Sequence, residues 1–164
     1  MIRRIIKLPL LILILLNPFS PLANESFERE NEVKNIINQS ILKWYSNLCA
    51  SNTEEVISLY SSKITFLPTS SKILIKDLKG VKNYFIGVNK KYKAFKINKC
   101  ILLNPEIILI DNNTVLVTGI DEFEGVIDNE NKDSFNIKGR QSFIFTKEKN
   151  KWKIIHHHRS RLPK

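Results

Sequence analysis

The sequence predicts an α+β fold in which helices from the first half of the chain pack on one face of a curved, mainly antiparallel sheet formed by the second half. Two observations support this prediction. Apolar residues recur at three- and four-residue intervals as far as Asn89, the spacing of one face of a helix. After Phe95 they form long runs separated by turn-forming residues, which is typical of antiparallel strands. Helices that cover one face of such a sheet are the expected α+β arrangement.

Three helices are predicted, over residues 27–48, 56–60 and 78–89. The first carries an apolar stripe that includes Trp44, and acidic residues crowd its start, where the helix dipole favours them. A short strand over residues 64–67 follows the second helix and ends at Pro68. All the predicted helices therefore precede residue 90.

An antiparallel meander of about four long strands is predicted next, from residues 95–103 with 107–110, 114–126, 135–146 and 152–159. Both faces of this sheet carry apolar side chains; Ile154 and Ile155, for example, point to opposite faces of the last strand. The helices can cover only one face. We therefore expect a homodimer or a higher oligomer that associates through the sheet.

The start of the chain has the pattern of a secretory signal peptide. Residues 1–7 contain three basic side chains and no acid, residues 8–16 are apolar apart from one proline, and the small residue Ala23 suits the cleavage position. The predicted organisation is a signal peptide over residues 1–23 and one domain over residues 24–164, exported to the periplasm or secreted. The alternative is a membrane anchor over residues 5–22.

The formal net charge of +10 raises the question of a polyanionic partner. The lysines are spread along the chain in ones and twos, and Lys90, Lys91 and Lys93 form the densest group. This spread indicates a solvated basic surface. We expect no nucleic acid partner and membrane contact only through the N-terminal segment.

The two cysteines, Cys49 and Cys100, leave two alternatives open. They could pair in an oxidising compartment and close a long loop, or both could be buried thiols. Neither lies in a Cys-x-x-Cys or Cys/His ligand pattern, so no metal site and no cofactor are expected.

The most specific part of the sequence is its C-terminal end. It consists of Gly-Arg-Gln-Ser-Phe-Ile-Phe over residues 139–145 and Trp-Lys-Ile-Ile-His-His-His-Arg-Ser-Arg-Leu-Pro over residues 152–163, preceded in order by Trp44, Gly119 and Phe123. The chain resembles the nuclear transport factor 2-like (SnoaL-like) superfamily. Within it, the chain is most similar to bacterial proteins that are themselves similar to the association domain of calcium/calmodulin-dependent protein kinase II. The resemblance implies a cone of helices wrapped by a bent sheet, a pocket inside the cone and dimerisation through the sheet.

The same resemblance implies site residues. The kinase association domain has His-Phe-His-Arg-Ser in its last strand, which residues 156–160 match except that His157 replaces the phenylalanine. The bacterial branch shows two adjacent histidines, and only His158 fits both versions. Arg140 matches an arginine that lines the pocket. Asp121 stands where the bacterial branch has a tyrosine.

Each candidate has a functional and a structural interpretation. Arg140 could hold the carboxylate of a small anionic ligand, or lie on the surface. His158 could be an acid/base group or a donor to the ligand, or a structural histidine. Asp121 could be a base in apolar surroundings, or one member of a salt bridge. Trp44 and Tyr60 could contact the ligand, or belong to the core.

Two classes of function follow. The first is a small-molecule-binding or oligomerisation module without chemistry. The second is an enzyme of isomerase, cyclase or dehydratase type, in which Asp121 or His158 is the acid/base and Arg140 holds an anionic group; it rests on fold analogy. Kinase motifs are absent from the sequence. If Arg140, Asp121 and His158 meet in one cavity, the enzyme interpretation gains support.

Overall fold

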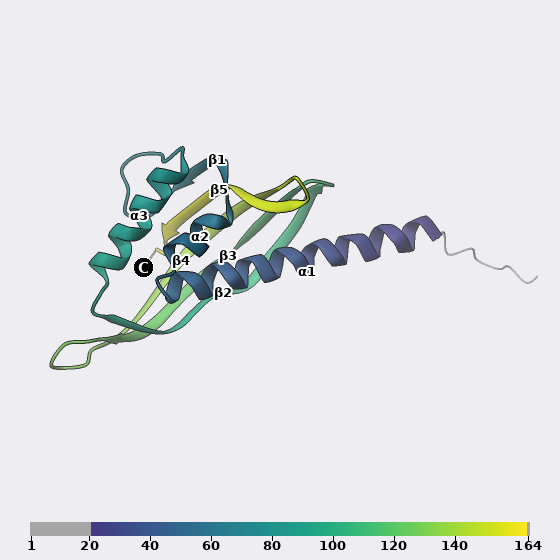
Figure 1. Ribbon diagram of the computed structural model, residues 1–164. Coiled ribbons are helices and arrows are strands. Elements are labelled where there is room, and N and C mark those ends of the chain that lie inside the picture. The colour runs from purple at the N-terminus through teal and green to yellow at the C-terminus, as the bar shows by residue number, and fades with distance from the viewer. Residues whose placement is uncertain (1–20, 164) are drawn as a thin grey trace, which may run out of the picture.

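The computed structural model describes residues 21–163 (Figure 1). Most of the expected signal peptide, residues 1–20, lies outside the described residues. Within residues 21–163, none of the helices has the length and apolar character needed to cross a membrane. The N-terminal half of α1 (Pro21–Cys49) projects beyond the sheet, whereas its C-terminal half lies against it (Figure 1).

The fold is α+β, as predicted. The remaining elements are α2 (Thr53–Ser58), β1 (Tyr60–Leu67), α3 (Leu78–Lys91), β2 (Phe95–Asp111), β3 (Thr114–Ile127), β4 (Ser134–Glu148) and β5 (Lys151–Arg161). The strands form one curved sheet in the order β1-β5-β4-β3-β2, in which β1 runs parallel to β5 and all other neighbours are antiparallel. The predicted meander corresponds to β2–β5, and the first strand adds a parallel edge.

One boundary was predicted wrongly. The second helix was expected to reach Tyr60, but α2 ends at Ser58 and Tyr60 begins β1. A helix of six residues has little cooperativity of its own. The backbone N–H of Leu59 closes the last turn on the Val56 carbonyl, at 3.2 Å. Tyr60 then enters the sheet, and its side chain is buried beside β5.

The core lies between the helices and the inner face of the sheet. It is formed by α1, α3 and the central strands, whose largest buried side chains are Ile37, Ile41, Trp44, Tyr45, Phe85, Phe143, Phe145 and Ile154. The start of α3 is fixed by the N-cap Asp77, whose carboxylate accepts a hydrogen bond from the Gly80 N–H at 2.7 Å. This cap sets the position of the helix that supplies one wall of the site described below.

The cysteines form a disulfide, which settles the alternative that the sequence left open. Cys49 at the end of α1 is bonded to Cys100 in β2, with 6.3 Å between the two Cα atoms. The bond ties the C-terminal end of α1 to the strand at the far edge of the sheet.

A β-bulge in β5 decides which side chains of the C-terminal strand face inward. Ile144 pairs with His156 and Phe145 pairs with Ile154, so Ile155 is one extra residue on β5. Each extra residue moves the following side chains to the opposite face. Ile154 and His157 are consequently both buried on the inner face, although three positions separate them.

Candidate functional site

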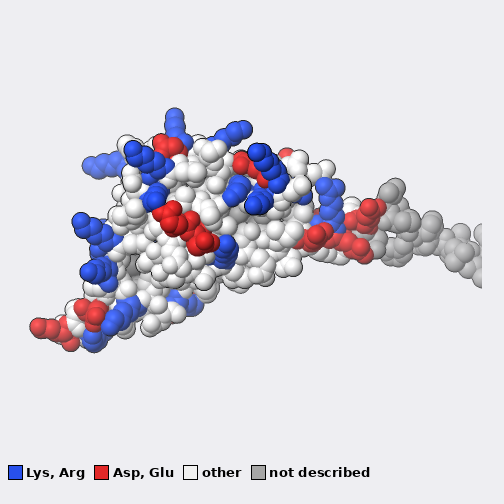
Figure 2. All heavy atoms as spheres, viewed as in Figure 1, with Lys and Arg blue, Asp and Glu red and all other residues white. Residues whose placement is uncertain are grey.

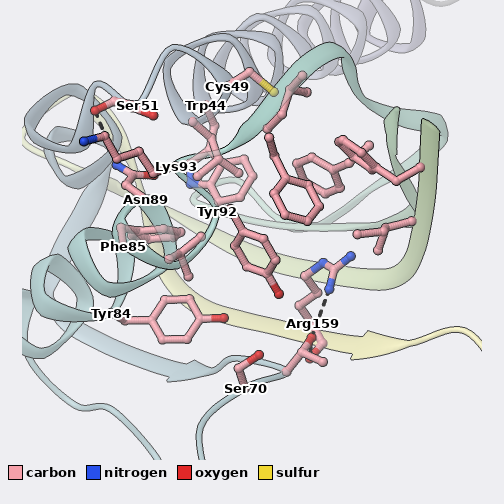
Figure 3. Close-up of a pocket in the computed structure, with 18 of the residues that line it drawn as sticks. Trp44, Cys49, Ser51, Ser70, Tyr84, Phe85, Asn89, Tyr92, Lys93 and Arg159 are labelled. Carbon is pink, nitrogen blue, oxygen red and sulfur yellow. Dashed lines mark hydrogen bonds between the residues drawn. The ribbon is translucent and has the colours of Figure 1, made fainter. Parts of the chain in front are cut away.

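A cavity of about 430 Å³ opens between α1, α3 and the inner face of the sheet (Figure 3). Its walls are largely apolar and aromatic. The residues that line it are Trp44, Leu48, Cys49, Ser51, Thr69, Ser70, Tyr84, Phe85, Val88, Asn89, Tyr92, Lys93, Phe95, Ile97, Phe123, Phe135, Ile137, His157 and Arg159. A volume of this size is typical of small-molecule sites, which run from about 300 to 1,000 Å³.

An ion pair between Arg159 and Asp121 lies beside the cavity. Asp121 is fully buried, and its two carboxylate oxygens accept hydrogen bonds from Arg159 Nε at 2.5 Å and from Nη2 at 2.9 Å. The third guanidinium nitrogen, Nη1, donates to Thr69 Oγ1 at 3.2 Å. The guanidinium also lies over the Phe123 ring, 5.5 Å from its centroid. The bidentate contact therefore compensates the charge of Arg159 inside the protein.

His157 belongs to the wall of the cavity, although only 1% of its surface is exposed. Its ring is stacked between Phe66 and Phe143, with 4.4 Å between ring centroids on each side. Its Nδ1 atom is 2.7 Å from the Tyr60 hydroxyl, which also accepts a hydrogen bond from Trp44 Nε1 at 3.0 Å. Side chains of helix α1 and strands β1 and β4 thus surround the imidazole that β5 carries.

This chain of hydrogen bonds fixes the tautomer of His157. The indole N–H of Trp44 can only donate, so it uses the Tyr60 oxygen as its acceptor. The Tyr60 hydroxyl is buried, and His157 Nδ1 is the acceptor that the described residues offer to its hydrogen, so we infer that the hydroxyl donates to Nδ1. His157 Nδ1 must accept, and the ring proton of a neutral imidazole must lie on Nε2. Burial lowers the pKa of His157 well below its usual value of 6.5, helped by the positive charges of its neighbours, so the neutral form is the relevant one.

Two buried polar atoms in this region have no hydrogen-bond partner among the described residues, His157 Nε2 and Gln141 Oε1. The amide nitrogen of Gln141 is 3.4 Å from the Tyr45 hydroxyl. Orphaned buried polar groups are rare in folded proteins, and each calls for an explanation. His157 lines the cavity and Gln141 does not.

The structure corrects the expected positions of Arg140 and His158. Both side chains are exposed and neither lines the cavity. Arg140 Nε donates to Ser160 Oγ at 3.1 Å, on the outer face of the sheet. Residues on one strand alternate between faces, and the inner face of β4 is taken by Gln141 and Phe143. Arg140 must therefore point outward, and the bulge in β5 sends His158 to the same side.

The other three candidates lie inside. Asp121 is fully buried, and of its two interpretations the structure shows the salt bridge, with Arg159 as the partner. Trp44 lines the cavity. Tyr60 does not line the cavity and is joined to the residues that do through its hydrogen bonds with His157 and Trp44. Arg140, Asp121 and His158 do not meet in one cavity.

Sequence reasoning missed His157 and Arg159 as the inward-facing polar residues of β5. Part of the signal was present: the bulky Phe143 and Phe145 share a face with Gln141, which marks that face of β4 as interior. The bulge that determines which β5 residues face the interior has no such pattern in the sequence. In residues 21–163 there is also no group of three or more His, Cys, Asp or Glu side chains that could hold a metal ion.

Comparison with known proteins assigns the family. The family model described as "Calcium/calmodulin dependent protein kinase II association domain" matches residues 29–163. The chain belongs to this family. A solved structure described as a putative association domain of this kind, from Xanthomonas campestris, is 25% identical, with a TM-score of 0.64, and the match covers 81% of this chain and 87% of that one.

Two other solved structures share the fold alone. An NTF2-like protein with a cystatin-like fold from Novosphingobium aromaticivorans has a TM-score of 0.72 at 10% identity, over 88% of this chain and 92% of that one. A putative scytalone dehydratase from the same organism has a TM-score of 0.69 at 12% identity, over 84% of this chain and 89% of that one. These matches confirm the cone-shaped NTF2-like fold. No curated protein matches the sequence significantly.

Proposed function

We propose that this association-domain protein is an exported small-molecule-binding module that holds its ligand in the cone cavity. The observation that carries the proposal is the cavity itself. Protein interiors pack with few voids larger than a water molecule. A space of about 430 Å³ with mostly apolar walls and a few polar groups has the make-up of a ligand site.

The proposal is tested by filling the cavity from α3. Val88 lines the cavity, whereas Ile86, on the same helix, is 48% exposed and does not. Native mass spectrometry of the purified protein should show a bound small molecule that Val88→Trp loses and Ile86→Trp retains. Equal occupancy in the two variants would place the molecule elsewhere. A protein that carries no small molecule and binds none from a metabolite library would contradict the proposal.

An enzyme of isomerase or dehydratase type receives less support. A putative scytalone dehydratase shares the fold, but at 12% identity. The three residues expected to perform such chemistry do not converge, and both oxygens of Asp121 already accept hydrogen bonds from Arg159. The cavity therefore offers binding groups more clearly than an acid/base pair.

Export is supported by two independent features. The signal-peptide pattern over residues 1–23 directs secretion, and the Cys49–Cys100 disulfide is the kind of bond that persists in oxidising compartments. Intact-mass measurement of the protein from the cell envelope or medium should give a chain that begins at Asn24. A full-length mass in a membrane fraction would instead favour the anchor over residues 5–22.

Self-association through the outer face of the sheet is the second part of the proposal. Ile108, Leu116 and Ile144 are register partners across β2, β3 and β4 and form an apolar row on that face. A second copy is the expected cover, since the helices occupy the inner face. Light scattering after size exclusion should give at least a dimer, which Leu116→Lys dissociates and Ile86→Lys does not. A strict monomer at micromolar concentration would contradict this part.

The distribution of charge supports a small ligand over a polyanion. Figure 2 shows lysine and arginine side chains scattered over the visible face, with acidic side chains between them. Nucleic-acid sites instead gather basic side chains into a patch or stripe. We accordingly propose no nucleic acid partner.

A further inference from the structure

Only one edge of the His157 ring is available to the cavity. Phe66 and Phe143 cover its two faces, and the edge that carries Nδ1 is bonded to Tyr60. None of these three residues lines the cavity, whereas His157 does. The edge that carries Nε2 is therefore the part of the imidazole that these three residues leave uncovered.

This edge presents a hydrogen-bond donor. The tautomer set by Trp44 and Tyr60 places the ring proton on Nε2, which has no acceptor among the described residues. A buried N–H without a partner is disfavoured, so an acceptor oxygen in the cavity would be bound in preference to an apolar group of the same shape.

The charges around the cavity favour a neutral ligand. The Arg159 guanidinium is compensated by the buried Asp121 carboxylate and bonded to Thr69 through its remaining nitrogen. Lys93, the other cation in the wall, is exposed to solvent. A carboxylate inside the cavity would lose its hydration without gaining an uncompensated partner. Figure 3 shows the hydroxyls of Tyr84 and Tyr92 pointing into the space in front of Arg159, where they add neutral polar groups.

The geometry points to an uncharged, largely apolar ligand with a carbonyl oxygen, such as a ketone, ester or lactone, that accepts a hydrogen bond from His157 Nε2. This inference rests on the proposed ligand-binding function and names the chemistry of the ligand. It differs from the small anionic ligand expected from the sequence, which depended on Arg140 lying in the pocket. His157 selects the carbonyl, and the aromatic walls accept the apolar body.

Three probes with one ring system separate the alternatives: 2-acetylnaphthalene, 2-ethylnaphthalene and 2-naphthoate. Their dissociation constants are measured by NMR titration of the isotopically labelled exported protein. The ketone should bind about tenfold more tightly than the hydrocarbon, which corresponds to about 1.4 kcal/mol. The ketone should also shift the resonance of His157 Nε2, a signal that needs no variant.

Two variants attribute the preference to the imidazole. His157→Phe keeps a flat ring between Phe66 and Phe143 but removes the donor, so the ketone and the hydrocarbon should bind equally. His158→Phe changes the exposed neighbour on the other face of the strand and should keep the tenfold preference. If His157→Phe does not fold, the chemical shift of Nε2 in the unmodified protein still shows whether the ketone contacts this atom.

Each other outcome overturns the inference in a recognisable way. Equal binding of ketone and hydrocarbon by the unmodified protein would show a cavity without carbonyl selection. Tightest binding of the carboxylate would show an anion site. In both cases the ligand-binding function stands. Failure of all three probes to bind would contradict that function as well as the inference.

Discussion

Replacing His157 by phenylalanine should remove a large part of the acid sensitivity of this fold. In the folded protein the imidazole is buried between two aromatic rings and accepts a hydrogen bond at Nδ1, so burial lowers its pKa well below the usual value of 6.5. The positive charges of His156, Arg159 and His158 act in the same direction. In the unfolded chain the same imidazole takes up a proton at its ordinary pKa.

The sign and size of the effect follow from proton linkage. The folded pKa is lowered, so the contribution of His157 to stability is fully present above pH 6.5 and is lost as the pH falls below this value. One proton taken up only by the unfolded state changes the free energy of unfolding by about 1.4 kcal/mol per pH unit. The loss from this residue therefore accumulates as the pH falls from 6.5 toward the lowered pKa of the folded state.

The assay is urea unfolding followed by tryptophan fluorescence at a series of pH values between 8 and 5. His157→Phe should be less stable than the unmodified protein at pH 8, because Tyr60 loses its acceptor. Its stability should nevertheless fall less steeply below pH 6.5, by about 1.4 kcal/mol per unit. His158→Phe, on the exposed side of the same strand, is the matched control. Parallel pH profiles for the unmodified protein and His157→Phe would refute the reasoning.

Three further results are expected. Replacing Cys49 and Cys100 by serine opens a loop with a sequence separation of 51, and chain entropy gives a loss of about 4 kcal/mol in the free energy of unfolding, measured by urea titration of the oxidised and variant proteins. Asp121→Asn leaves the Arg159 guanidinium without its buried counter-charge and should cost about 3–5 kcal/mol in the same titration. Hydrogen bonds from neighbouring lysines lower the pKa of Glu122 from 4.5 to about 2. Its contribution to the free energy of unfolding is therefore complete above pH 4.5 and is lost as the pH falls toward 2. Glu122→Gln should flatten that part of the acid-unfolding profile.

The fold could be predicted from local patterns because each pattern is set by nearby residues. The third helix was placed over residues 78–89 and spans Leu78–Lys91, since its apolar stripe and its N-cap are both local. The boundary at Tyr60 was missed because nearby residues alone do not determine it. The interval from Val56 to Tyr60 fits a helix and the alternation from Ile64 to Phe66 fits a strand, and only pairing with β5 decides where one ends.

The pairing of the two cysteines could be predicted only in part from the sequence. The residues themselves are evident in the sequence, but whether they pair depends on the distance between α1 and β2. That distance is a tertiary property, set by the packing of Trp44 and Tyr45 against the sheet. The export signal made an oxidising compartment the expectation, and the 6.3 Å between the Cα atoms then permits the bond.

The site residues of β5 could not be assigned because one inserted residue controls them. In a regular strand Ile154, His156 and His158 would share a face, and a buried Ile154 would place His158 in the cavity. Ile155 is an extra residue relative to β4, and it exchanges the two faces for the rest of the strand. Resemblance to a family identifies positions along the chain and leaves their faces undetermined, so it indicated β5 but not which of its histidines lines the cavity.

Histidine stands at position 157 where the kinase association domain has phenylalanine. Its burial is explained only together with Tyr60 and Trp44. An imidazole is flat enough to occupy the stack between Phe66 and Phe143, but its two nitrogens need partners once buried. The Tyr60 hydroxyl satisfies Nδ1, and Trp44 in turn satisfies the Tyr60 oxygen. What this arrangement leaves over is a single buried N–H on a residue that lines the cavity, held in place by Tyr60 behind the wall and by Trp44 within it. A donor positioned in this way selects for an acceptor oxygen at one point and leaves the remainder of the ligand to the apolar walls.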